Sequence, residues 1–189
     1  MIRNLESELQ KMSIRIAFVG DSLTHGGRWQ EFFPNQEIAN FGVPGEKSSQ
    51  ILARFDQVIA WNPKKIFLMM GINDLGEGLG VEIILRHYQE IIARIKEIGQ
   101  VELYVQSLLP INPMLFTNPK LSKNDIVMVN YRLQELCENE NISFINLYSC
   151  FSNYGNELIS EYTYDGLHLN EAGYKLWVNR LRSDQLLQE

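Results

Sequence analysis

Strand-like and helical patterns alternate along most of the chain, and this alternation restricts the fold more than any other feature of the sequence. Several of the strand-like runs are apolar on both faces, which is typical of strands that helices cover on each side. Strands that alternate with helices form βαβ units with right-handed crossovers, and such units build a mostly parallel sheet. The sequence therefore predicts a three-layer α/β/α sandwich around a mostly parallel five-stranded sheet, for which we expect the flavodoxin-like strand order 2-1-3-4-5. The predicted strands are 14–20, 37–43, 64–71, 101–110 and 142–148.

The predicted helices carry apolar residues at the spacing of one helical face. The clearest pattern covers 81–98 and ends before Gly99, a typical stop signal. Its apolar stripe consists of Val81, Leu85, Tyr88, Ile92, Ile95 and Ile98. Further helices are predicted for 47–60, 123–138 and 171–187, the last with Ala172, Trp177 and Leu181 facing inward. A length of 189 residues fits one domain, 1–189, with a short N-terminal helical extension in 1–12.

Charge and composition exclude several classes of function. The net charge is −6 and no basic run is present, so we expect no nucleic-acid partner. Two cysteines, Cys137 and Cys150, are too few for a disulfide framework. Residues 1–13 contain no signal-peptide core, and the longest apolar run, 66–72, is too short to span a bilayer. We therefore expect a cytoplasmic protein with a small-molecule substrate and no membrane span; the sequence leaves homo-oligomerisation open.

Polar residues stand where the predicted strands end. Ser22 follows the first strand, Gly42 ends the second and Asn73 follows the third, while Asp165 and His168 lie beyond the fifth. In the predicted strand order the first three strands are neighbours, so their carboxyl ends bring Ser22, Gly42 and Asn73 together. Taken singly, each residue also has a purely structural explanation, as a helix cap or a turn residue. Their joint occurrence favours a functional site.

These residue types fit acyl transfer. A serine hydroxyl is a weak nucleophile until a base removes its proton, and a histidine suits that task near neutral pH. We predict Ser22 as the nucleophile, His168 as the base and Asp165 as the carboxylate that orients the imidazole. The tetrahedral intermediate is anionic and needs fixed hydrogen-bond donors. The backbone N–H groups of Ser22 and Gly42 and the side-chain amide of Asn73 are the candidates.

Four blocks of the chain resemble the GDSL, or SGNH, hydrolase family. They are Gly20-Asp21-Ser22-Leu23, Asn40-Phe41-Gly42, Gly71-Ile72-Asn73-Asp74 and Asp165-Gly166-Leu167-His168, in the family's order. The resemblance implies a flavodoxin-like sandwich, ester hydrolysis by the same triad and oxyanion donors, and neither metal nor cofactor. Residues 40–55 and 165–177 are similar to the branch with sialate O-acetylesterase-like enzymes and platelet-activating-factor acetylhydrolases, which implies a short acyl group, with an acetyl ester of a carbohydrate as the expected substrate.

Several alternatives stay open at this point. His25 lies three residues from Ser22 and competes with His168 as the base, although no aspartate stands near it in sequence to orient it. His87 reads as a surface residue of the helix 81–98. The loop 111–121 is either a packed connection or a rim over the acyl site. The alternative functions are a lysophospholipase- or thioesterase-type acylhydrolase and a non-catalytic ligand-binding protein on the same scaffold.

Overall fold

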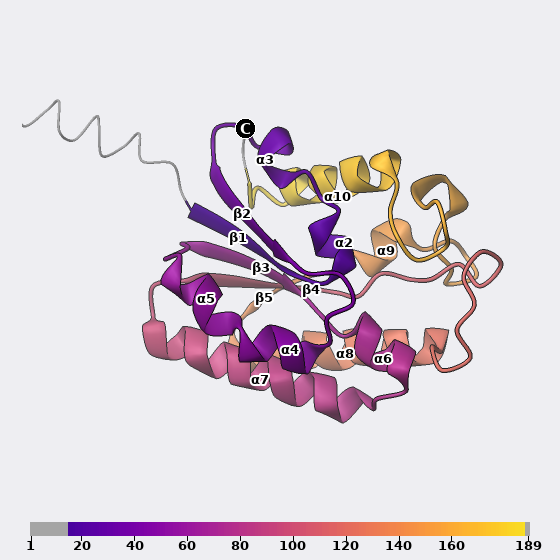
Figure 1. Cartoon of the computed structure of the whole chain (residues 1–189), viewed down its shortest axis with the longest axis horizontal. Helices are drawn as coiled ribbons and strands as arrows, with labels where there is room; N and C mark the ends of the chain where they lie inside the picture. The colour runs from indigo at the N-terminus through magenta and orange to yellow at the C-terminus, as the bar shows by residue number, and fades with distance from the viewer. Residues whose placement is uncertain (1–14, 188–189) are drawn as a thin grey trace, which may run out of the picture.

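The computed structural model describes residues 15–187 and contains the predicted parallel sheet (Figure 1). Five strands follow the order β2-β1-β3-β4-β5, and every neighbouring pair is parallel. The predicted strand order and fold class are therefore confirmed. The strands are β1 (Arg15–Gly20), β2 (Glu37–Gly42), β3 (Lys65–Met69), β4 (Glu102–Gln106) and β5 (Ser143–Ile145).

Helices cover both faces of the sheet and form the outer two layers. In the view of Figure 1, α4, α5, α6, α7 and α8 lie below the sheet, and α2, α3, α9 and α10 lie above it. No helix within residues 15–187 is long and apolar enough to cross a membrane. The helices are α2 (Ser22–His25), α3 (Trp29–Phe32), α4 (Ser48–Ala53), α5 (Phe55–Ala60), α6 (Ile72–Glu77), α7 (Val81–Ile98), α8 (Lys123–Glu140), α9 (Tyr148–Phe151) and α10 (Glu171–Ser183), with a 3₁₀ turn at Ser160–Tyr162.

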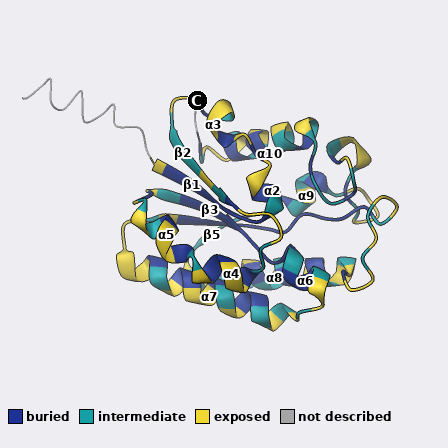
Figure 2. Ribbon diagram, viewed as in Figure 1, coloured by how far each residue is buried: buried dark blue, intermediate teal, exposed yellow. Residues whose placement is uncertain are grey.

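The core lies along the central strands, which are buried along most of their length (Figure 2). Aromatic rings form a continuous stack on one face of the sheet. Phe18 of β1 lies beside Phe67 of β3 at 4.9 Å between ring centroids, and Phe67 lies 4.8 Å from Tyr104 of β4. Trp29 of α3 stacks on Phe18 at 4.1 Å, so the stack also anchors the segment that follows the first strand. Offset or stacked aromatic contacts of this kind stabilise a core beyond their buried area.

The structure departs from the predicted helices at a few places. The helix predicted for 47–60 is split into α4 and α5 at Arg54, where the backbone leaves helical geometry with φ −100° and ψ 6°. The Arg54 guanidinium instead binds Glu46 and donates to the Phe41 carbonyl. Helix α7 has its predicted bounds, although its last residue, Ile98, is exposed. The extension predicted for 1–12 lies outside the described residues.

Candidate active site

Ser22 lies at the point where β1 ends and α2 begins. Asp21 is the N-cap of α2, and its Oδ1 accepts the Leu23 N–H at 3.0 Å. Ser22 is the first residue of the helix, so its own N–H belongs to the helix terminus and has no intrahelical acceptor. The structural explanation therefore applies to Asp21, which caps the helix, and leaves the hydroxyl and N–H of Ser22 for another role.

Ser22, His168 and Asp165 are connected by hydrogen bonds, and we call them the outer cluster. Ser22 Oγ lies 3.0 Å from His168 Nε2, and His168 Nδ1 lies 2.7 Å from Asp165 Oδ2. Asp165 Oδ1 accepts the backbone N–H groups of Leu167 and His168, at 2.9 and 2.7 Å. One carboxylate oxygen thus holds the turn while the other holds the imidazole. The structure brings together three residues that lie up to 146 positions apart in the sequence.

The hydrogen bonds that Asp165 accepts favour its ionised form. Partial burial acts to raise the pKa of the Asp165 carboxyl, but the hydrogen bonds from the His168 side chain and from two backbone N–H groups outweigh it and lower the pKa. The Tyr164 ring stacks beside the imidazole at 6.0 Å between centroids and an interplanar angle of 12°. An ionised Asp165 that accepts from Nδ1 leaves Nε2 of a neutral His168 as the proton acceptor toward Ser22.

Asp21 is a fully buried carboxyl beside the outer cluster. Its pKa is raised to about 7 by burial, while the Leu23 N–H and His168 act in the opposite direction and the charge of Asp74 adds to the increase. Its Oδ2 has no hydrogen-bond partner within residues 15–187. The group is therefore poised to gain or lose a proton near neutral pH.

Gly42 ends β2 with its N–H already in use. It donates to Asn40 Oδ1 at 2.9 Å, and this hydrogen bond conflicts with the oxyanion role predicted for Gly42. The residue is a glycine for a different reason, because a Cβ would come within 2.2 Å of the His25 backbone nitrogen. Gly42 does not have the positive φ that would explain a glycine in a turn. Gly42 thus allows the close approach of β2 and α2.

The next glycine along this loop has a free donor. Gly45 is exposed with φ +78°, and within the described part of the chain its N–H has no hydrogen-bond acceptor. The Asn73 side chain faces the same loop, because its Nδ2 donates to the Glu46 carbonyl at 2.9 Å. One amide hydrogen of Asn73 remains for another acceptor. The sequence alone did not distinguish Gly45 from Gly42, three positions earlier, because the hydrogen bond of the Gly42 N–H to Asn40 is visible only in the structure.

The two remaining histidines lie elsewhere. His25 Nδ1 lies 3.1 Å from the Gly42 carbonyl oxygen, so this histidine is engaged at the end of β2. His87 lies on α7, and its Nδ1 is 2.7 Å from Ser48 Oγ in the layer below the sheet. The prediction of a simple surface position for His87 is wrong, because its ring is half-buried and hydrogen-bonded. Within residues 15–187, neither ring forms a hydrogen bond with Ser22.

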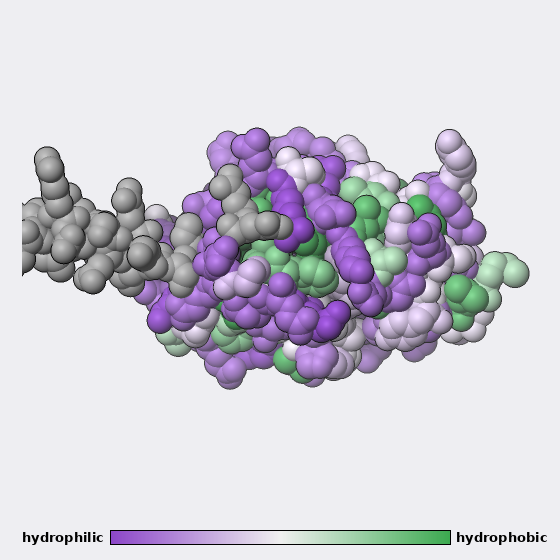
Figure 3. Space-filling model, turned by 90° about the horizontal axis from the view of Figure 1, so that it is seen from above, coloured by the Kyte–Doolittle hydropathy of each residue, from purple (hydrophilic) through white to green (hydrophobic). Residues whose placement is uncertain are grey.

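The loop 111–121 packs on the turn that carries Asp165. The Asn112 N–H donates to the Gly166 carbonyl at 2.8 Å, and the Asn112 side chain is held by the Leu158 carbonyl. Met114 and Leu115, at the middle of the loop, are exposed. In Figure 3 hydrophilic residues cover most of the face seen from above, and hydrophobic ones gather in separate areas, one of them at the right-hand end where this loop projects in Figure 1. The loop is therefore a packed connection at its ends with an exposed apolar tip; whether this tip borders the acyl site stays a prediction.

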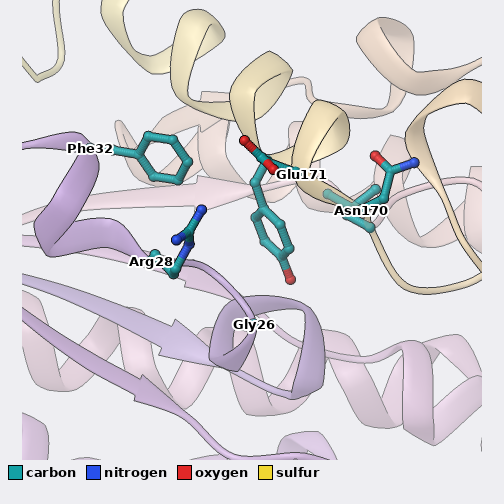
Figure 4. A pocket seen from close by; sticks show the side chains of 7 residues that line it. Gly26, Arg28, Phe32, Asn170 and Glu171 are labelled. Carbon is teal, nitrogen blue, oxygen red and sulfur yellow. The ribbon is translucent and has the colours of Figure 1, made fainter.

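A cavity of about 210 Å³ lies between the segment that joins α2 to α3 and the start of α10 (Figure 4). The Gly26 N–H on its wall donates to the Ser22 carbonyl, and Leu169 directly follows His168. Figure 4 shows Arg28 and Phe32 on one side of the cavity and Asn170 and Glu171 on the other. The lining residues are Gly26, Arg28, Phe32, Leu169, Asn170, Glu171 and Tyr174.

Comparisons with known proteins agree with this architecture. The family model described as "GDSL-like Lipase/Acylhydrolase family" matches residues 18–176. No match is found among curated proteins. Among solved structures, a protein of Streptococcus pneumonia assigned as a platelet activating factor is similar with a TM-score of 0.82 and 27% identity over 97% of each chain.

Two further structures share the fold at lower identity. A GDSL-like lipase from Bacteroides thetaiotaomicron has a TM-score of 0.80 and 22% identity, with 98% of each chain covered. An acetyl xylan esterase has a TM-score of 0.76 and 22% identity, with 90% of this chain and 99% of that chain covered. All three structures have the sheet and its covering helices in common with this chain.

Proposed function

Because the chain belongs to the GDSL-like lipase/acylhydrolase family and is thus a hydrolase of ester bonds, we propose that it is a serine esterase that forms an acyl-enzyme on Ser22. The observation that carries this proposal is the series of hydrogen bonds from Ser22 Oγ through the His168 imidazole to Asp165. In this series the serine is the terminal member, and Ser22 is only partly buried. A non-catalytic binding protein has no need of such a series.

The proposed reaction begins when Ser22 Oγ attacks the carbonyl carbon of the ester and His168 Nε2 takes the hydroxyl proton. Asp165 stabilises the imidazolium that results and keeps the ring oriented. When the tetrahedral intermediate collapses, the C–O bond to the alcohol breaks and the leaving oxygen receives the proton from His168. Water then attacks the acyl-enzyme with His168 again as the base, which releases the acid and restores Ser22.

The donors for the oxyanion are proposed from unpaired N–H groups that follow the neighbouring parallel strands β1, β2 and β3. The Ser22 N–H at the start of α2 and the second amide hydrogen of Asn73 meet this requirement. From the loop after β2 we assign Gly45 in place of Gly42, because the Gly42 N–H is bound to Asn40. Preorganised donors of this kind stabilise charge that develops only in the transition state, so they act on kcat more than on KM.

For the substrate we propose a small ester with a short acyl group, with acetyl on a carbohydrate as the first candidate. The acetyl xylan esterase with the same fold is compatible with such a substrate. The exposed Met114 and Leu115 favour a second candidate, a longer acyl or lipid-like substrate that contacts the apolar tip of the loop 111–121. The two candidates differ in how the rate depends on acyl length.

The experiment compares kcat/KM for p-nitrophenyl acetate, butyrate and octanoate, with Ser22→Ala as the control for background hydrolysis. We expect the highest value for acetate and a decline toward octanoate. A steady increase toward octanoate favours the lipid-like substrate instead. A panel of acetylated sugars, lysophospholipids and acyl thioesters then identifies the alcohol or thiol part. Hydrolysis that persists unchanged in Ser22→Ala refutes the acyl-enzyme.

A further inference from the structure

A second group of serine, histidine and aspartate lies below the sheet, and we call Ser48, Asp74 and His87 the inner cluster. Ser48 Oγ donates to Asp74 Oδ1 at 2.5 Å, and the Ser48 N–H donates to Asp74 Oδ2 at 2.8 Å. Ser48 Oγ also lies 2.7 Å from His87 Nδ1. Since the hydroxyl proton is already directed at Asp74, His87 supplies the proton of this second hydrogen bond from Nδ1.

The inner cluster is not a second catalytic centre. Ser48 and Asp74 have no solvent exposure, so an ester cannot reach the Ser48 hydroxyl. Serine is the central member of the cluster, with its proton given to a carboxylate and a lone pair given to the imidazole N–H. A serine in this arrangement has no free base and is not a nucleophile.

The inner cluster connects three elements that surround the proposed oxyanion donors. Ser48 is the first residue of α4, directly after the loop of Gly45 and Glu46; Asp74 belongs to the first turn of α6, next to Asn73. His87 belongs to α7, which packs against α4. The Asn73 side chain closes the arrangement through its hydrogen bond to the Glu46 carbonyl. The positions of Asn73 and of the Gly45 loop therefore depend on the same buried hydrogen bonds.

We propose that the inner cluster is a positioning device for the oxyanion donors, in which Ser48, held between Asp74 and His87, fixes the Gly45 loop relative to Asn73. This inference rests on the proposed function, because it assigns the donors to an acyl-transfer reaction. Loss of the inner cluster leaves every reacting group present, but the Gly45 N–H and the Asn73 amide are then no longer held at a fixed distance from each other. Small displacements of positioned groups are costly, since about 1 Å of misplacement can lower a rate by about 10²-fold.

The test measures kcat, KM and Tm for Ser48→Ala and for the matched control Ser107→Ala. Ser107 is also fully buried, and its Oγ accepts one backbone N–H, from Tyr148 at 2.8 Å. We expect kcat of Ser48→Ala to fall on the order of ten-fold with KM within about two-fold. Ser107→Ala is expected to lower Tm and to keep kcat within about two-fold. A merely structural role of Ser48 predicts the same behaviour for both variants, and that result overturns the proposal.

A second pair of variants acts at the half-exposed end of the cluster, where folding is less at risk. His87→Ala removes the donor to Ser48 and is expected to lower kcat in the same way as Ser48→Ala. His87→Asn places an amide N–H close to the position of Nδ1 and is expected to restore most of kcat. If His87→Asn is as slow as His87→Ala, or if the loss appears in KM alone, the proposal is refuted.

Ser22→Ala, measured in the same assay, distinguishes a failure of the proposed function from a failure of the positioning role alone. If wild-type hydrolysis does not depend on Ser22, the proposed function fails and the positioning role fails with it. If hydrolysis depends on Ser22 but Ser48→Ala behaves like Ser107→Ala, only the positioning role fails.

Discussion

The outer and inner clusters contain the same three residue types, and they differ in order and in exposure. In the outer cluster the histidine is central, with Ser22 on one side and Asp165 on the other. In the inner cluster the serine is central, between Asp74 and His87. The His168 side chain is 30% exposed, whereas Ser48 and Asp74 are sealed from solvent.

This difference shows that the residue types in a polar cluster do not by themselves define a catalytic site. A hydroxyl becomes a nucleophile when its proton points at a neutral imidazole and its lone pairs face a substrate. A hydroxyl whose proton points at a carboxylate and whose lone pair accepts from an imidazole is fully satisfied and acts as a structural joint. We expect substitutions in the two clusters to have effects that differ in size by orders of magnitude.

The largest expected contrast is between His168→Ala and His87→Ala. Removal of His168 takes away the proposed base, so kcat should fall by about 10³–10⁴-fold. Removal of His87 is expected to cost only on the order of ten-fold, because it changes position and not chemistry. Steady-state kinetics on p-nitrophenyl acetate measures both, with His25→Ala as a control expected to stay within a few-fold of wild type. The assignment of the outer cluster is refuted if His25→Ala or His87→Ala is slower than His168→Ala.

Asn73→Ala is expected to have the next largest effect, since Asn73 is a proposed oxyanion donor and also binds the Glu46 carbonyl beside the inner cluster. Loss of one oxyanion donor typically costs about 10²–10³-fold in kcat, or roughly 2.7–4 kcal/mol. Asn73 also donates to the Glu46 carbonyl, so we expect a loss of stability of about 1 kcal/mol as well. Asn73→Asp is expected to be slower still, because a carboxylate would face the developing negative charge. A destabilised Asn73→Ala with unchanged kcat would show that the residue only holds the loop.

Asp21→Asn tests the buried carboxyl that interacts electrostatically with His168 of the outer cluster and Asp74 of the inner cluster. Burial raises its pKa to about 7 in the folded state, while His168 lowers and Asp74 raises it. A carboxyl with a raised pKa binds its proton more tightly when folded, so its stabilising contribution is present at low pH and is lost as pH rises through about 7. Relative to Asp21→Asn, which keeps an oxygen for the Leu23 N–H, the wild type should lose roughly 2–3 kcal/mol between about pH 5 and about pH 8.

Urea unfolding of both proteins across this pH range measures the difference. A difference that grows with pH supports the raised pKa. A constant difference means that Asp21 is ionised throughout the range and that the N-cap hydrogen bond outweighs burial.

Glu77→Gln is expected to have the smallest effect, although the ion pair of Glu77 with Lys47 joins α6 to the start of α4, as the inner cluster does. Its carboxylate pairs with Lys47 at 2.8 Å on the surface, where solvent screens the interaction. We expect kcat within about two-fold of wild type and little change in Tm. A ten-fold loss of kcat would mean that the surface ion pair, and not the buried serine, holds the Gly45 loop. The same kinetic assay and thermal unfolding decide between them.

The sequence was sufficient to locate the strands, because long apolar runs define them. The strand order was expected from the flavodoxin-like arrangement, and the structure confirms it. Ser22, Asp165 and His168 could be singled out because they follow the predicted strand ends. Helix α7 was predictable to its last residue, since 18 residues give several turns of periodic pattern. Helices α2, α3 and α9 have only four residues each, too few for a period, and none was predicted.

The inner cluster could not be predicted, because its hydrogen bonds join residues 26 and 39 positions apart on three different helices. Asn73-Asp74 was visible as a motif, but the partner of Asp74 depends on how α4 packs beside α6. The choice between Gly42 and Gly45 also required the structure, since it depends on where the Asn40 side chain points. The predicted roles of Ser22, Asp165, His168 and Asn73 stay predictions until the variants are measured.

The central claim, that Ser22 and not Ser48 is the nucleophile, is tested most directly by covalent labelling. The native protein is incubated with a fluorophosphonate probe, which reacts with activated serines, and the labelled peptide is mapped by mass spectrometry. We expect a single adduct on Ser22, no adduct on Ser48 and no labelling at all in Ser22→Ala. An adduct on Ser48 or on any other serine, with Ser22 unmodified, would contradict the account.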